Sequence, residues 1–542
     1  MISMKKLLAI VLTCALLTGC GAKPAETAPS TSVPETAAPT EAVEVVKEVT
    51  GDIVDILLEG QNITVSGKAD GVYTSRDIIY YEDKEVYDSG NPYGEGSDAD
   101  RHTKEEANAH LVVNITAPGN YRLSGKLDLG QIRIDLGEDA DKDPNAVVNL
   151  ILDGVDINCE VGPAILFLNV YECDGDTSPD TARPDVDTTA AGANLILAEN
   201  SRNTVTGAYV AKIFRDQEEE KKLWKQDGAI YSYMSMNVYG PGSLDLQAEN
   251  EGLDTELHLT IWSGDISIRS GNDGINTNED GVSVTTIRGG SLRIAAGLGE
   301  EGDGIDSNGY LVIRGGTVIS AANPASDAGL DSDLGSFIHG GTVVALGSAM
   351  DWAESDSGQV TINAQFSQMQ TGDIRIFHED GTEVFSFSPA TDPVLKENIR
   401  SYQGAILSCP GFRVGDVYTV FVDGLQMAYT GTDVMMGPGG FGNFAPGQRP
   451  ENGPPEDREP GQTPPDMPQG TAPSMPAGEM PTRPEGEMPT WPEGQMPSMP
   501  QGEMPTRPQE PPQGFGNSGG EANTLFVMQD KVNFFSGLTL AE

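Results

Sequence analysis

Five segments between residues 229 and 345 repeat the same alternation of apolar and polar positions at intervals of 22 to 30 residues. Their apolar positions are Ile230, Leu253, Ile275, Ile305 and Leu330. A second set recurs in phase with the first, with apolar positions at Leu244, Ile266, Leu292, Val318 and Val343. Alternation with a period of two residues predicts β-strands. Gly-Gly pairs at 289–290, 315–316 and 340–341 precede the later strands and predict corners with positive φ.

The repeat predicts an all-β fold, a parallel β-helix in which each unit makes one turn of a solenoid. The unit is too short for a propeller blade, and it lacks the helical stretch of many leucine-rich repeats. Turns stacked about 4.8 Å apart place equivalent residues in columns, with the apolar columns inside. Less regular strands of the same solenoid are expected at 121–123, 131–134, 147–152, 164–167 and 194–197.

Two stretches interrupt the strands and are interpreted as insertions, 174–192 and 211–226, the second as a short charged helix. The period is lost after residue 358, where alternation at 374–377 and 417–422 predicts a small β-rich cap. Apolar alternation returns after residue 523 and predicts a strand that docks back on the domain.

Changes in composition mark the boundaries of these parts. Residues 22–50 are rich in Ala, Pro, Thr and Glu and cannot bury enough apolar surface to fold. The Gly-, Pro- and Met-rich stretch after residue 437 favours extended polyproline II; it is interpreted as a wall-crossing spacer, with a methionine-rich copper(I) site as the alternative. The predicted parts are a signal peptide (1–19), a disordered tether (20–50), an N-terminal β-rich cap (51–107), the parallel β-helix (108–348), a C-terminal β-rich cap (349–432), a disordered linker (433–522) and an apolar C-terminal segment (523–542).

The first twenty residues combine a basic start, an apolar stretch and Leu17-Thr18-Gly19-Cys20. This pattern resembles the bacterial lipobox, which implies cleavage before Cys20 and acylation of that cysteine. The apolar stretch is short for a permanent bilayer span, although an uncleaved transmembrane segment is the alternative. The protein is therefore expected outside the cytoplasm, anchored by lipid to the cell membrane.

Acidic residues outnumber basic ones by 82 to 33, for a formal net charge of −49. Such a balance repels nucleic acid and anionic lipid heads, so neither is an expected partner, whereas cations are. Residues 297–302 fit GxGxxG, but no helix is expected after them, so a nucleotide is not an expected ligand either. Cys159 and Cys173 are compatible with a disulfide or with buried free thiols.

Stacking also aligns polar positions into a first column of acidic and amide residues. Two carboxylates 4.8 Å apart repel by about 3 kcal/mol at an effective dielectric constant near 20. Because Ca²⁺ takes six to eight oxygen ligands from carboxylates, amides and carbonyls, the column predicts bound calcium. The alternative is a solvated turn edge in which Asp and Asn only shape the corners. The candidate ligands are Asp254, Asp273, Asn276, Asp303, Asp306 and Asp331.

A second column precedes the glycine corners and joins aromatic to basic residues. Neighbouring isoleucines are expected to point inward, so these side chains should point outward. Pyranose C–H faces stack on aromatic rings, and arginine pairs with uronate carboxylates, so the column is a candidate carbohydrate-binding strip; a merely solvated column is the alternative. Its members are Tyr239, Trp262, Arg288, Arg314 and His339, of which the first four are the predicted sugar-binding residues.

Several motifs together resemble a known family, the bacterial extracellular carbohydrate-binding β-helix proteins related in fold to pectate lyases. The likeness runs through 150–157, 162–165, the Asp-Gly-Ile repeats at 273–275 and 303–305, and then 408–410 and 415–419. It implies a right-handed parallel β-helix, bound calcium, and affinity for cellulose or acidic plant polysaccharides.

These observations favour a non-catalytic surface protein that binds polysaccharide (cellulose, a pectin-like chain or a wall glycan) with the help of calcium. The rival from the enzymes is a pectate-lyase-like eliminase with Arg288 or Arg314 as base, which needs carboxylates beside the arginine. The two columns fall at different corners of the predicted turn, which favours binding alone. A structural adhesin or wall spacer is the third hypothesis.

Overall fold

The computed structural model describes residues 47, 49–67, 70–81, 102–175, 178–213, 224–299, 301–432 and 522–541, all within one compact unit, Ala42–Glu542. These residues are almost entirely β-structure, with large sheets whose strands are mostly parallel. The α-helical part of the described chain is α2 (Lys104–Ala109), and η2 (Ala140–Lys142), η3 (Pro179–Thr181) and η4 (Leu395–Glu397) are single 3-10 turns. Within this part of the chain, no helix has the length and apolar character to cross a membrane.

Seven parallel strands form a first ladder, which we call ladder 1. Its members are β4 (Leu111–Ile115), β6 (Gly130–Asp135), β8 (Ile165–Asn169), β13 (Gly228–Ser232), β16 (Glu251–Thr255), β19 (Ile275–Thr277) and β22 (Ile305–Ser307). The antiparallel β3 (Val72–Ser75) closes its N-terminal edge on β4.

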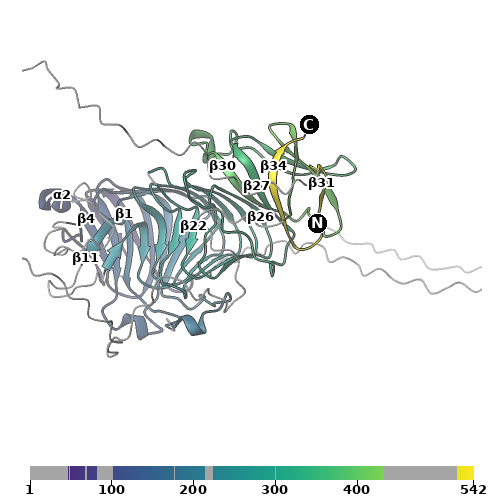
Figure 1. Cartoon of the computed structure of the whole chain (residues 1–542). Coiled ribbons are helices and arrows are strands. Elements are labelled where there is room, and N and C mark those ends of the chain that lie inside the picture. Colours follow the sequence, from purple (N-terminus) through teal and green to yellow (C-terminus); the bar gives the residue numbers. More distant parts are fainter. Residues whose placement is uncertain are drawn as a thin grey trace, which may run out of the picture. The chain divides into compact units, whose positions relative to one another are not determined.

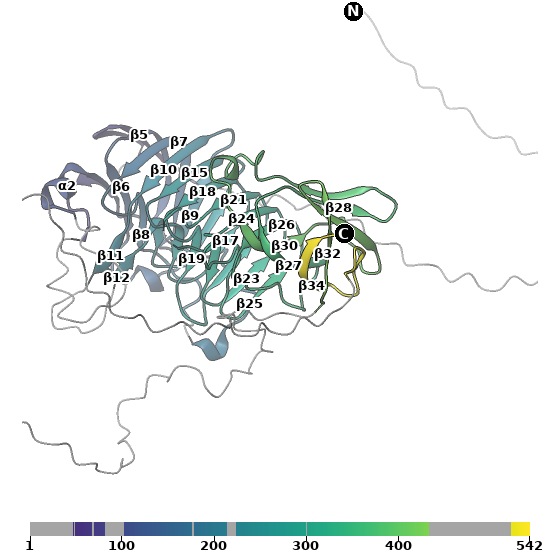
Figure 2. The ribbon, with the colours of Figure 1, turned by 45° about the horizontal axis from the view of Figure 1, so that its top comes forward.

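The other parallel strands form two further ladders. Ladder 2 is β1 (Ile53–Gly60), β5 (Gly119–Leu127), β7 (Val148–Cys159), β10 (Arg202–Gly207), β15 (Ser243–Ala248), β18 (Asp265–Ser270), β21 (Ser291–Ala295), β24 (Thr317–Ala321) and β26 (Thr342–Gly347). Ladder 3 starts on the first half of β7 and continues with β9 (Ala193–Leu197), β14 (Met236–Tyr239), β17 (Leu259–Ile261), β20 (Val284–Ile287), β23 (Tyr310–Ile313) and β25 (Gly335–Ile338). Between β8 and β22 the chain repeatedly visits ladders 1, 3 and 2 in that order, and Figures 1 and 2 show the strands side by side.

The predicted apolar columns are confirmed by strand register. Ile230 pairs with Leu253, Leu253 with Ile275, and Ile275 with Ile305. In ladder 2 the predicted order Leu244, Ile266, Leu292, Val318, Val343 is continuous across four strand pairs. All of these side chains and Leu330 belong to one buried core, so the period-two pattern identified the inner face of the strands correctly.

The second glycine of each predicted corner has positive φ, at +77° for Gly290, +82° for Gly316 and +92° for Gly341. The stacking leaves no room for side chains there, because a Cβ on Gly316 would lie 2.7 Å from the carbonyl oxygen of Gly290. Both conformation and close approach therefore require glycine at these corners.

The C-terminal region is β-rich and packs on the last strands of ladder 2, because Ile319, Val344 and Leu346 belong to the same buried core as its own apolar residues. β30 (Tyr402–Ser408) pairs antiparallel with β26 and with β27 (Thr361–Gln370). The predicted final strand is confirmed: β34 (Val532–Leu540) pairs in parallel with β27 (Figure 1, yellow and green). The remaining strands are β28 (Ile374–His378), β29 (Glu383–Phe387), β31 (Val417–Val422), β32 (Leu425–Ala428) and β33 (Phe526–Val527).

Some expectations need correction. In the stretch 211–226, interpreted as an insertion with a charged helix, the two described ends form an antiparallel pair, β11 (Val210–Ile213) and β12 (Trp224–Gln226), whereas residues 214–223 lie outside the described residues. The pairing of the two strands satisfies backbone N–H and carbonyl groups of both. Ladder 2 already begins at β1, which is extended by the antiparallel β2 (Asn62–Ser66), ahead of the predicted boundary at residue 108. Cys159, Cys173 and Cys409 are free thiols, and the predicted signal peptide, almost all of the tether, and the linker lie outside the described residues.

Candidate functional site

The acidic column follows the outward side of ladder 1. Asp254 pairs with Asn276, and Asn276 with Asp306, so the predicted third-position residues are in register. Asp331 continues the column, because its N–H donates to the Ile305 carbonyl at 2.8 Å. Alternation places these side chains opposite the buried Leu253, Ile275 and Ile305, on the face where solvent would be expected.

This outward column is nevertheless shielded from solvent: Asp254, Asp273 and Asn276 are buried, and Asp303, Asp306 and Asp331 are half-buried. Asp254 is 0% exposed and Asp273 is 7% exposed. Burial raises the pKa of both carboxyls well above the usual range, and the neighbouring Glu251 carboxylate adds to the rise in each. Burial also raises the pKa of Asp303 to about 8 and that of Asp306 to about 7, with Asp331 as the next cause for both. The alternative of a fully solvated turn edge is therefore wrong for this column.

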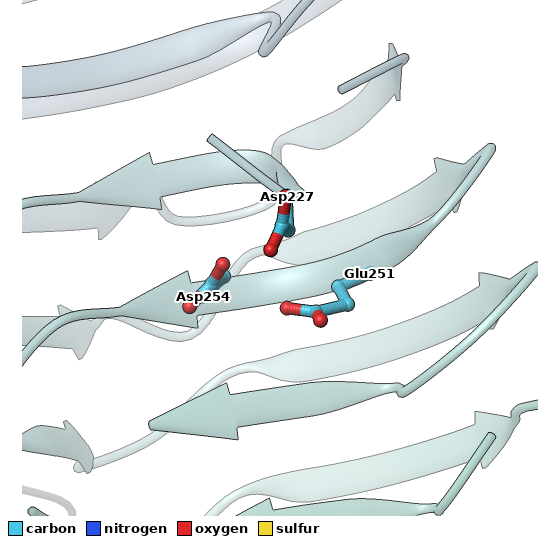
Figure 3. Close-up of side chains that lie close together, drawn as sticks. All are labelled: Asp227, Glu251 and Asp254. Carbon is cyan, nitrogen blue, oxygen red and sulfur yellow. The ribbon is translucent and has the colours of Figure 1, made fainter. Parts of the chain in front are cut away.

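Three carboxylates converge at the upper end of the column. One ligand oxygen from each of Asp227, Glu251 and Asp254 lies within 4.8 Å of the other two, and Figure 3 shows the three groups directed toward one another. Asp227 immediately precedes β13, and Glu251 begins β16, where its backbone pairs with Gly228. Two oxygens on opposite sides of a Ca²⁺ ion are separated by about 4.8 Å when each bond is about 2.4 Å, so the cluster has the span that calcium needs.

Several oxygens in this cluster lack hydrogen-bond partners although they are buried. They are Glu251 Oε2 and Asp254 Oδ2, and Oδ1 of Asn276, the next residue of the column, also lacks a partner. The other oxygen of each carboxylate accepts from an amide: Asn276 Nδ2 donates to Glu251 Oε1 at 3.2 Å, and Asn278 Nδ2 donates to Asp254 Oδ1 at 2.6 Å. An unpartnered buried oxygen is costly, and a cation is the group that three such oxygens would satisfy together.

A lysine from the neighbouring hairpin lies beside the cluster. Lys225 Nζ is 2.9 Å from Asp227 Oδ2. One ammonium group compensates one of three carboxylates, so negative charge remains for a divalent cation. Lys225 and Asp227 were missed by sequence reasoning because both fall at the edge of a stretch interpreted as an inserted helix.

The lower predicted ligands are held differently. The Asp303 N–H donates to Asp273 Oδ1 at 2.6 Å, and the Ala328 N–H donates to Asp303 Oδ1 at 2.5 Å. Of the six predicted ligands, the three-carboxylate cluster contains Asp254, with Asn276 hydrogen-bonded to its Glu251. Asp351, also missed, extends the buried acidic set: burial raises its pKa to about 8, and the Ser332 hydroxyl donates to it at 2.8 Å.

The aromatic and basic column follows ladder 3 in the predicted order. We call the strands of one repeat unit a rung. The backbone N–H groups of Trp262, Arg288, Arg314 and His339 each donate to a carbonyl oxygen of the preceding rung, at 2.9, 2.8, 2.7 and 2.7 Å. Stacking of the column is thus as expected, but Tyr239 is 3% exposed and packs in a small apolar cluster with Ile151 and Ile196. The expectation that Tyr239 offers a surface to sugar is wrong, because residues before β1 cover it: Val49 packs on the cluster and Lys47 Nζ lies 5.3 Å from the ring centroid.

Trp262 is half-buried, and both faces of its indole are occupied. The Tyr239 ring stacks on it with centroids 5.7 Å apart and planes 9° apart, and the Arg288 guanidinium lies 4.7 Å from the ring centroid. Trp262 Nε1 donates to Asn237 Oδ1 at 2.9 Å. No indole face is therefore free for a pyranose ring, and a sugar at this column would meet ring edges, Arg288, Arg314 and the exposed His339.

A hollow that the sequence did not indicate lies at the ends of strands in ladder 2. Its volume is about 380 Å³. It lies apart from both columns, and polar side chains from consecutive rungs contribute to its lining. They include Asn158, Glu160, Thr206, Gln247, Glu249 and Arg269. None of these positions stood out in the sequence, since polar residues at strand ends carry no period of their own.

Comparisons with known proteins identify the family. A family model described as carbohydrate-binding domain-containing protein matches residues 109–182 and 177–383, together about half of the chain. A carbohydrate-binding domain-containing protein of Acetivibrio thermocellus is 29% identical over 160 residues, which are 29% of this chain and 45% of that relative. The match thus spans less than half the length of the relative.

A solved structure, a polysaccharide lyase-like protein from C. thermocellum as a gadolinium derivative, is 22% identical and covers 54% of this chain and 93% of its own. Its TM-score of 0.33 is too low to establish a shared fold. The family match alone decides the assignment: the chain belongs to the carbohydrate-binding domain-containing proteins.

Proposed function

We propose that this protein is a non-catalytic surface lipoprotein that binds polysaccharide and depends on calcium to do so. The observation that carries the calcium part is the buried cluster of Asp227, Glu251 and Asp254 with its unpartnered oxygens. Asn276 would add its free Oδ1, and backbone carbonyls would complete the shell. Asp273, Asp303, Asp306 and Asp331 remain proposed ligands of further ions down the same column.

Calcium would stabilise the framework and would affect glycan binding only indirectly. Because Asp254 is 0% exposed, a polysaccharide cannot contact the cluster itself. The ion would remove the repulsion between neighbouring rungs of ladder 1, and the same rungs continue into ladder 3 and hold Trp262, Arg288 and Arg314 in register. The carboxylates of ladder 1 are buried and lie at another corner of the turn than the arginines, and Arg314, a candidate base, forms an ion pair with Asp185. Both observations favour binding over elimination chemistry.

The framework that we propose is a right-handed parallel β-helix. In support, three parallel ladders are visited in constant order, and equivalent residues pair from rung to rung over more than a hundred residues of chain. The proposed location, outside the cytoplasm with acylated Cys20, is supported by the lipobox-like sequence. The anchor is tested by Cys20→Ser, which should lose membrane association whether or not the signal peptide is cleaved.

The function is tested by pull-down of the full chain on cellulose, wall glycan and pectin, in calcium or in a chelator. We expect binding in calcium, loss of binding after chelation, and no growth of unsaturated-uronate absorbance. Asp254→Asn should bind glycan with a weakened response to calcium, whereas Asp139→Asn, an exposed acid away from the column, should behave as wild type. Glycan binding that is equal with and without calcium contradicts the calcium dependence, and sustained uronate release contradicts the non-catalytic assignment.

A further inference from the structure

The insertion between β8 and β9 runs alongside the aromatic and basic column. Its segment 185–188, which we call the strap, alternates in exposure: Val186 and Thr188 are buried, and Asp185 and Asp187 are exposed. Val186 packs with Val284 and Val312 of ladder 3. The strap therefore lies on the outer face of ladder 3 as an extended segment.

Thr188 fixes the strap to the rungs that also hold Trp262. Its hydroxyl hydrogen-bonds with Asn237 Oδ1 and with the Thr260 hydroxyl, each at 2.7 Å, and Asn237 Nδ2 donates to the Thr188 carbonyl at 2.7 Å. Asn237 also accepts the hydrogen bond from Trp262 Nε1. The buried Asn237 side chain thus hydrogen-bonds to both the strap and Trp262 of the column, so it fixes the position of one relative to the other.

The exposed residues of the strap bring negative charge to the arginines. Arg314 Nη2 donates to Asp185 Oδ1 at 3.0 Å. Hydrogen bonds from Thr189 lower the pKa of Asp187, and the nearby Arg288 guanidinium lowers it further. Two carboxylates therefore stand beside the two arginines that had been expected to pair with uronates.

We propose that the strap sets the specificity of the carbohydrate surface for neutral glycans, because Asp185 already forms an ion pair with the Arg314 guanidinium to which a uronate carboxylate would bind. This inference rests on the proposed function and narrows its ligand class. A uronate would have to displace Asp185 from Arg314 while facing Asp187 and a protein of net charge −49.

A neutral sugar meets no such obstacle. Each sugar hydroxyl is both donor and acceptor, and a paired aspartate and arginine offer acceptor lone pairs and N–H donors side by side. Vicinal hydroxyls can therefore bridge Asp185 and Arg314 without separating them. The charge balance of the strap and column, two carboxylates against two guanidiniums, matches an uncharged chain.

The test compares two soluble probes, a cello-oligosaccharide and an oligogalacturonate of equal length, by calorimetry on the full chain in calcium. Wild type should bind the neutral probe and bind the oligogalacturonate at least tenfold more weakly. Asp185→Asn, which keeps the shape and removes the negative charge beside Arg314, should gain at least tenfold in oligogalacturonate affinity. Asp180→Asn, an exposed acid of the same insertion, changes net charge equally and should gain nothing.

Arg314→Gln added to Asp185→Asn should cancel the gain, since the freed guanidinium is its cause. Oligogalacturonate binding by wild type as tight as that of the neutral probe overturns the inference, as does an Asp185→Asn variant with unchanged preference. If neither probe binds to wild type or to any variant, the proposed function fails and the specificity inference fails with it.

Discussion

Ladder 1 and ladder 3 each carry a polar column on the outward side of the same stacked rungs. In ladder 1 the stacked rungs bring carboxylates together where they are shielded from solvent, and oxygens of Glu251, Asp254 and Asn276 lack hydrogen-bond partners. In ladder 3 they bring Tyr239, Trp262 and Arg288 into one continuous stack, and Arg314 pairs with Asp185. The first column leaves buried acceptor oxygens that a cation would satisfy. The second packs its rings and guanidinium groups against one another, and its buried atoms without partners are donors, Arg288 Nε and Arg314 Nε.

The difference teaches that register alone does not make a binding surface. Like charges in register repel, so burial turns a column of acids into a demand for a cation. Aromatic rings and guanidinium groups in register attract one another, so the same stacking uses up the faces that a sugar would need.

The largest expected effect comes from breaking the rungs that both columns share. Ile275 is fully buried and pairs with Leu253 and Ile305. Ile275→Ala should lower the free energy of unfolding by about 2–5 kcal/mol, because it leaves a cavity between rungs. Denaturant titration followed by circular dichroism measures this, and calcium and glycan binding should weaken together.

Ile275→Val is the matched control and should cost about 0.5–1.5 kcal/mol. A loss below that of the valine variant would show that the apolar columns do not carry the stability of the rungs.

Of the two columns, calcium should stabilise only the acidic column of ladder 1. At 100 times its dissociation constant, calcium should add about 2.7 kcal/mol to the free energy of unfolding. Asp254→Asn should make the metal-free protein more stable at pH 7, since a buried carboxyl with a raised pKa is replaced by a neutral amide, and should weaken the response to calcium. Melting in calcium and in chelator measures both, and a variant that is less stable without metal and equally responsive contradicts the assignment.

The pH dependence should distinguish the two columns further. In the folded, metal-free chain the pKa is about 8 for Asp303 and about 7 for Asp306, against about 4 for an unfolded carboxyl. The folded state therefore holds more protons than the unfolded state above pH 4. The contribution of these groups is complete below pH 4 and is lost as pH rises toward 8.

Melting temperature in chelator should accordingly fall between pH 5 and pH 8, and calcium should flatten or reverse that fall. Asp306→Asn should show a shallower fall, whereas Asp139→Asn, which is exposed, should not. A melting temperature that rises with pH in chelator would contradict the burial of ionisable groups in ladder 1.

The smallest expected effect belongs to the aromatic and basic column of ladder 3. Trp262→Phe keeps a ring between Tyr239 and Arg288 but loses the hydrogen bond to Asn237, and should cost about 0.5–1.5 kcal/mol. Because neither indole face is free, affinity for a neutral oligosaccharide should change less than twofold. A much larger loss of affinity in a variant of unchanged stability would show that sugar contacts the indole directly.

Much of the fold followed from the sequence because a repeat fixes both period and register. The pairing of Ile230 through Ile305, the glycine corners and the docking of the final strand all depend on local alternation that can be counted. The expected alignment of Asp254 with Asn276 and Asp306 followed from the same period.

The sequence period does not predict which residues cover the outward side of a column. The burial of Asp254 and the approach of Lys225 depend on how an irregular stretch folds back. The covering of Tyr239 by Lys47 and Val49 joins residues almost two hundred positions apart, and the pairing of Asp185 with Arg314 joins residues 129 apart. Such contacts come from aperiodic segments, whose path no local pattern determines.

The central claim is that the buried acids of ladder 1 hold calcium. Titration of chelator-stripped protein with calcium in a calorimeter tests it most directly, with Asp254→Asn and Asp139→Asn beside wild type. The account predicts saturable binding by wild type and Asp139→Asn, with the tightest site lost in Asp254→Asn. Absence of calcium binding by the wild type, or equal binding by the Asp254→Asn variant, would contradict it.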